Sequence, residues 1–304
     1  MINLGNIEIA DLRLGESQVK ALYLGSEQVW SGEEPGPAAE PLCFTAEGSN
    51  ASVALVHGSN TMTPSPVMEY STDNSSWSSY TLGTTVTLAN KGDKVYFRAA
   101  DVNPRIGNND IYRWEASYNN YFNCRNVSVS GKLVSVLRKD MDESLTYTNE
   151  PGIYKCMLRN FNNNNPQIVS AKDLQLPNLS AFGVQALMGL FASSTLSAAP
   201  ALPQRCSVAN ESFAYMFENC SKLSSISSPI TTATGFAMDG SAAGGPFGTM
   251  FGGANKFNQE EFKLVIEGVP SFGSKALQEV FRNNTSFTGK FIIDMTSYAS
   301  VPTI

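Results

Sequence analysis

The sequence predicts a β-rich α+β protein of several domains: an N-terminal β-meander, a β-sandwich-like domain and a C-terminal solenoid of irregular repeats. Three observations lead to this prediction. A short repeat opens the chain, brief alternating segments separated by turn residues follow, and a motif that ends in phenylalanine recurs in the last half. A chain of 304 residues is also too long for one ordinary hydrophobic core.

Residues 1–31 are predicted to form a small docking module. The segment 12–19, LRLGESQV, is followed closely by 22–29, LYLGSEQV. Alternating leucines around a Gly-led polar turn are typical of hairpins, and two in a row predict a three-stranded meander that ends at Trp30. Such a piece is too small to bury its own apolar face, so we expect it to dock onto a larger partner. Residues 32–41 are rich in Pro and Gly and predict a stiff linker.

Residues 42–137 are predicted to form the sandwich-like domain. Short β segments recur at even spacing, with turn clusters such as Asp73-Asn74-Ser75 between them. Short strands separated by turn residues in this way are typical of antiparallel sheets that pack face to face. The expected strands are 42–46, 52–57, 67–71, 84–89, 94–99, 127–129 and 132–137.

Residues 138–304 are predicted to form stacked coils. Four segments read apolar-x-x-apolar-Phe, and each is followed by a polar loop and a further apolar residue. A degenerate copy lies at 154–158. The spacing of the apolar residues predicts one helical turn in each coil, followed by a tight turn and a short strand such as 223–226 or 290–293. Unrelated amphipathic helices of an ordinary core are the alternative. The four repeated phenylalanines, which we expect to share one interior, are Phe191, Phe217, Phe251 and Phe281.

Composition and charge exclude several classes of partner. The net charge is −6 and no basic run is present, which argues against nucleic acid. No apolar stretch approaches the length of a membrane span, and the first residues lack the features of a secretory signal. Five dispersed cysteines predict free, buried thiols instead of a disulfide framework or a zinc site.

Little in the sequence indicates catalysis. His57 is the only histidine, which excludes a Ser-His-Asp triad and a multi-histidine metal site built by this chain alone. We therefore expect no cofactor, no metal and no enzymatic activity. Paired carboxylates are the exception to consider, because they hydrolyse glycans. The acidic candidates, which we interpret as solvated surface, are Asp140, Asp142, Glu143, Glu260 and Glu261.

Aromatic residues are the stronger candidates for a binding surface. Exposed aromatic faces stack on sugars and anchor interfaces, since they bury much area at a low entropic cost. The alternative is that these side chains fill the core of the β domain and its junction to the coils. The candidates for contact with a glycan or protein partner are Trp77, Tyr112, Trp114, Tyr118 and Tyr121.

The repeat segments resemble the BspA-like leucine-rich-repeat proteins of gut Bacteroidales and their phages. The segment 213–223, FAYMFENCSKL, matches best, whereas Gly252-Gly253-Ala254 replaces the usual Asn-Cys step. The opening segment 22–30 resembles N-terminal modules of phage structural and fibre proteins. The resemblance implies a leucine-rich-repeat solenoid in a tail- or head-fibre-like virion protein. We expect it to bind other virion proteins through its N-terminal module, to be multimeric, and to contact a host glycan or surface protein. A bacterial surface adhesin is the first alternative, and a glycan-active enzyme is the second.

Overall fold

The computed structural model divides the chain into two compact units, Met1–Glu40 and Pro41–Ile304. Its described residues form strands, turns and a single 3₁₀ helix, η2 (Leu133–Val136), so the predicted β-rich class is confirmed. The described residues contain no α-helix, and the helical turn expected in each repeat is therefore wrong for this part of the chain. The described residues are 2–4, 7–9, 13–14, 17–18, 21–24, 27–31, 40–57, 66–103, 106, 120–141, 152–160, 167–177, 181–209, 211–226, 230–232, 245–266 and 279–294.

The described residues of the first unit form three separate hairpins instead of one three-stranded meander. Each pair of antiparallel strands forms its own two-stranded sheet. Within each pair the strands lie two residues apart in the chain, which is the shortest common antiparallel connection. Each Gly-containing unit of the repeat therefore closes on itself. The pairs are β1 (Ile2–Leu4) with β2 (Ile7–Ile9), β3 (Arg13–Leu14) with β4 (Ser17–Gln18), and β5 (Ala21–Leu24) with β6 (Glu27–Ser31).

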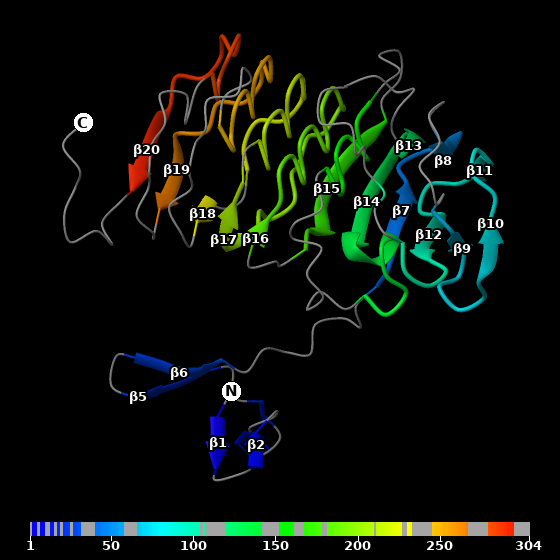
Figure 1. The fold of residues 1–304 in the computed structure, drawn as a ribbon, viewed down its shortest axis with the longest axis horizontal. Helices are drawn as coiled ribbons and strands as arrows, with labels where there is room; N and C mark the ends of the chain where they lie inside the picture. The colour runs from blue at the N-terminus through cyan, green and yellow to red at the C-terminus, as the bar shows by residue number, and fades with distance from the viewer. Residues whose placement is uncertain are drawn as a thin grey trace. The chain divides into compact units, whose positions relative to one another are not determined.

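The second unit begins with two sheets (Figure 1). The larger has the order β10-β9-β12-β7-β14-β15 and the smaller has the order β11-β8-β13. The strand predicted at 132–137 is wrong, because β14 ends at Lys132 and η2 follows it. The strands are β7 (Leu42–Ala46), β8 (Ala51–His57), β9 (Met68–Ser71), β10 (Ser78–Tyr80), β11 (Val86–Leu88), β12 (Lys94–Ala99), β13 (Asn120–Arg125), β14 (Val127–Lys132) and β15 (Ile168–Gln175).

Aromatic rings fill the space between the two sheets. Phe44 and Phe97 of the larger sheet lie 4.9 and 5.2 Å, centroid to centroid, from Phe122 of the smaller sheet. All three side chains are buried. The backbone N–H of Leu55 on β8 donates a 2.9 Å hydrogen bond to the Tyr80 hydroxyl on β10, which ties the edge strand of the larger sheet to the central strand of the smaller one.

The larger sheet continues into the repeat half of the chain. β14 pairs antiparallel with β7 on one side and parallel with β15 on the other. Five further strands form a parallel sheet in sequence order, and Figure 1 shows them side by side. They are β16 (Ala181–Phe182), β17 (Gln204–Val208), β18 (Ile230–Thr232), β19 (Glu261–Ile266) and β20 (Lys290–Asp294). The strand predicted at 290–293 is therefore present, whereas 223–226 is irregular.

A column of turns occupies the position where short helices were expected. We name its members turn segments A (152–160), B (184–193), C (211–219), D (245–253) and E (279–283). Alternate residues donate their backbone N–H to the next segment: Phe191 to Met216 O at 3.0 Å, and Phe217 to Met250 O at 3.0 Å. The residues between them donate within their own segment, three positions back. In an α-helix every interior backbone N–H donates within the helix. Here half of these N–H groups donate to the neighbouring coil instead.

The turn column requires left-handed backbone at residues that rarely adopt it. At one equivalent position of the five segments φ is +58° at Cys156, +62° at Gly189, +58° at Tyr215, +52° at Thr249 and +61° at Glu279. Left-handed backbone costs about 1–2 kcal/mol for a residue with a Cβ. The hydrogen bonds between segments offset this cost. Since glycine occupies this position only once, the sequence carries no clear signal for it.

The four repeated phenylalanines form a continuous stack. The rings of Phe191 and Phe217 lie 5.8 Å apart with an interplanar angle of 1°. Phe251 stacks on Phe217 at 5.6 Å, and Phe281 stacks on Phe251 at 5.6 Å. The apolar residues that follow the motif join the same interior, as Phe257 does by stacking on Phe251 at 4.1 Å. Successive coils therefore share one apolar interior along the stack.

We expect none of the five cysteines to react with Ellman's reagent in the folded protein. All five are free and buried, which confirms the sequence prediction. Burial raises the pKa of Cys206 to about 11 and that of Cys220 to about 12, so almost no thiolate nucleophile exists at neutral pH. Titration in native buffer should give no rapid release of the coloured product, and titration in concentrated urea should give five equivalents. A thiol that reacts rapidly in native buffer contradicts this expectation.

Candidate functional site

The structure does not gather the predicted aromatics into one site. Trp77 and Tyr121 belong to the described residues, whereas Tyr112, Trp114 and Tyr118 lie outside them. Trp77 precedes β10 of the larger sheet, and Tyr121 lies on β13 of the smaller sheet. Both are half-buried, and burial raises the pKa of the Tyr121 hydroxyl.

One face of Trp77 is already covered. The guanidinium carbon of Arg98 lies 3.7 Å from the centroid of the ring, a cation–π contact. Arg98 also donates a 2.8 Å hydrogen bond to the carboxylate of Glu69, and Lys139 pairs with the same carboxylate at 3.3 Å. Burial raises the pKa of Glu69, but the bonds from Arg98 and Lys139 outweigh it and lower that pKa overall. The ring face of Trp77 is therefore covered by a charged cluster of Arg98, Glu69 and Lys139 on the outer side of the sheet.

Three of the titratable candidates, His57, Asp140 and Glu261, have partners within the structure. His57 Nδ1 lies 2.5 Å from Oδ1 of Asn120, across the β8–β13 pair. Asp140 forms an ion pair with Arg138 at 2.5 Å, and Glu261 pairs with Lys290 at 3.8 Å. Glu260 is exposed. Asp142 and Glu143 lie outside the described residues.

The described part of the chain contains neither a candidate metal site nor a candidate membrane-spanning helix. No three His, Cys, Asp or Glu side chains there are grouped closely enough to hold a metal ion. No helix in those ranges is long and apolar enough to cross a bilayer.

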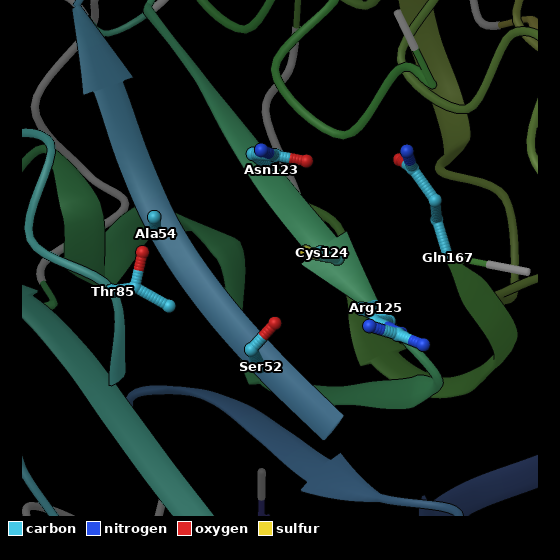
Figure 2. Close-up of a pocket in the computed structure, with 7 residues that line it drawn as sticks. All are labelled: Ser52, Ala54, Thr85, Asn123, Cys124, Arg125 and Gln167. Carbon is cyan, nitrogen blue, oxygen red and sulfur yellow. The ribbon is translucent and has the colours of Figure 1, made fainter. Parts of the chain in front are cut away.

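A first hollow lies on the outer face of the smaller sheet. Val53 and Leu55 point inward from β8, so the alternate residues Ser52 and Ala54 face outward, where their small side chains leave space. The cavity measures about 190 Å³ and is polar. Figure 2 shows Asn123 and Arg125 of β13 beside Ser52 and Ala54 of the adjacent strand, and the lining is completed by Thr85, Cys124 and Gln167. This first hollow offers hydrogen-bonding groups to a ligand but would enclose little of it.

A second hollow lies over turn segment D. It measures about 310 Å³, and its floor is formed by Thr249, Gly252 and Gly253. Segment C contributes Glu218 and Asn219 to one wall, and segment E contributes Arg282 and Asn283 to the other. We call this hollow the D slot. The sequence contained its signal, because Gly252 and Gly253 stand where the neighbouring repeats have Glu-Asn and Arg-Asn, but sequence reasoning alone did not connect that difference with a site.

Charge alternates with small residues along the column that contains the D slot. The carbonyls of Ala192, Glu218, Gly252 and Arg282 each accept a hydrogen bond from the preceding segment, at 3.0, 2.7, 2.7 and 2.8 Å. These four residues therefore occupy equivalent positions in segments B to E. Burial raises the pKa of Glu218, and the positive charges of Arg159 and Arg282 oppose that shift. The slot thus has a partly desolvated carboxylate on one side and a guanidinium on the other.

The fold is that of a β-rich protein in which two packed sheets continue into a stack of parallel-stranded coils. Comparisons with protein-family models, with curated proteins and with solved structures give no match for the chain.

Proposed function

We propose that this chain is a non-enzymatic structural protein of a bacteriophage particle, tail- or head-fibre-like, which attaches the virion to its host. The observation that carries the proposal is the division into a small unit of three hairpins and a much larger second unit. Isolated two-stranded hairpins are marginally stable in water. An assembly partner would supply the missing packing surface, which assigns the first unit to docking on other virion proteins.

The second unit has the features of a presenting domain. Its β part corresponds to a sandwich and its coils to a leucine-rich-repeat solenoid of the BspA-like kind. Stacked coils give an extended surface that many copies in one particle can present together. The chain is 16% charged, so hydroxyls and amides supply much of its polar surface. Such groups suit contact with a host glycan or a surface protein.

Purified particles test the proposal. Mass spectrometry of density-purified virions should detect the chain in stoichiometric, repeated copies, and cryo-electron microscopy should show it on the outside of the tail or head. Pre-incubating host cells with the purified full chain should slow adsorption of the phage. Absence of the chain from particles contradicts the proposal.

The two alternative functions predict different experimental results. A bacterial adhesin would be detected by antibodies on intact, uninfected Bacteroidales cells and would be missing from particles. A glycan-active enzyme would shorten capsular polysaccharide, and a single carboxylate substitution would abolish that turnover. Neither outcome is expected from a virion attachment protein.

A further inference from the structure

We propose that the D slot binds one neutral pyranose unit of a surface glycan, between Glu218 and Arg282. The proposal takes its ligand class from the attachment role proposed above, on which it rests. It adds a site that does not involve the aromatic candidates.

The dimensions of the slot suit a single ring. Neighbouring parallel strands lie about 4.7–4.9 Å apart, so equivalent residues two coils apart are separated by about 10 Å at the backbone. Glu218 and Arg282 are two coils apart, with Gly252 between them. The cavity of about 310 Å³ lies at the lower end of the range of ligand sites.

The slot floor has no room for a side chain at either glycine. A Cβ added at Gly252 would lie 2.3 Å from Cγ2 of Thr249, which is closer than atoms can approach. At Gly253, where φ is +63°, an added Cβ would lie 2.2 Å from Oδ1 of Asn219. Any side chain at either position would therefore displace its neighbours. The two glycines therefore let the side chains of Thr249 and Asn219 lie close to the backbone of segment D.

The walls carry hydrogen-bonding groups that are available to a ligand. Arg282 Nη1 donates to Glu279 at 3.2 Å, which orients a guanidinium whose side chain is 56% exposed. Within the described residues, the side chains of Glu218, Asn219 and Asn283 make no hydrogen bond. A carboxylate accepts from hydroxyls, a guanidinium donates to them, and amides do both.

The balance of charge favours a neutral ligand. One carboxylate and one guanidinium face the slot, so an anionic sugar would be attracted by one wall and repelled by the other. Hydroxyls on opposite sides of a pyranose ring would contact both walls at once. A zwitterionic amino acid also matches two opposite charges, and the experiment includes it as a separate arm. A single site of this kind is weak, and repeated copies raise the effective affinity.

The test is binding of the full chain to an array of neutral oligosaccharides built from glucose, galactose, mannose and N-acetylglucosamine, with free glycine and arginine as competitors. Glu218→Gln and Arg282→Ala are each expected to reduce the bound signal at least about tenfold, the loss of roughly one charged hydrogen bond. The matched controls Glu260→Gln and Lys256→Ala change exposed residues outside the slot and should bind as the wild type does. Unchanged thiol titration and urea midpoints establish that the slot variants are folded.

Three outcomes overturn the slot proposal. Wild-type binding that both slot variants retain places the glycan elsewhere on the chain and leaves the attachment role intact. Binding of amino acids without binding of oligosaccharides assigns the slot to a zwitterion. No binding of any neutral sugar removes the proposal, while the particle experiment above decides independently whether the chain is a virion protein.

Discussion

Replacing Phe217 by alanine is expected to lower the free energy of unfolding by about 3–5 kcal/mol, the range for a fully buried phenylalanine. The ring is completely buried and stacks on Phe191 at 5.8 Å and on Phe251 at 5.6 Å. Its removal opens a cavity in the middle of the stack, and both neighbouring rings lose a face-to-face partner. The measurement is urea unfolding followed by circular dichroism, which should show a clearly lower midpoint.

Phe281→Ala is the matched control for that substitution. Phe281 occupies the equivalent position in segment E but is only half-buried. Less apolar area is lost there, so we expect a smaller decrease than that of Phe217→Ala. Equal midpoints for the two variants would show that stability does not depend on the depth of a phenylalanine within the stack.

Lys155→Met is expected to destabilise the protein by a similar amount, about 3–5 kcal/mol, because it removes one charge from a buried polar network. Lys155 is completely buried, and its Nζ donates a 3.0 Å hydrogen bond to Oε1 of Gln185. The amide of Gln185 donates in turn to the carboxylate of Glu211. These three residues join segments A, B and C, and Gln185 and Glu211 are also buried. Methionine keeps most of the apolar stem, so the effect reports the lost ammonium.

The double variant Lys155→Met with Glu211→Gln tests the coupling of the two charges. With both removed, no buried charge is left without its counterpart, and most of the lost stability should return. Urea midpoints of the wild type, the two single variants and the double variant complete the cycle. Strictly additive losses would mean that Gln185 does not connect the lysine with the glutamate.

The local features of this protein could be predicted because each depends on residues that are close together in the sequence. Period-two alternation placed strands at 42–46 and 94–99, and the structure has β7 and β12 with the same bounds. The repeated phenylalanines could be aligned from their motif alone, since the same residue types recur in the same order. Buried thiols followed from the dispersed cysteines.

The conformation of the turn column could not be predicted, for a physical reason. Apolar residues at i, i+3 and i+4 fit a helical turn and equally fit successive four-residue turns. The choice depends on where the backbone N–H groups donate, and here Phe191 and Phe217 donate to the next coil. That partner exists only once the coils are stacked. Left-handed backbone at Tyr215 and Thr249 is stable for the same reason.

By itself the sequence determined the β-rich class, the main strands of the first sheets and the recurrence of the phenylalanines, because each depends on residues close together in the chain. Only the tertiary structure decided the hairpin pairing in the first unit, the turns of the repeats, the buried Lys155–Gln185–Glu211 network and the D slot. In the network and the slot, residues from three different coils meet. Contacts of that kind depend on the register in which the coils stack. Backbone hydrogen bonds between the coils set this register, and they form only when the coils come together.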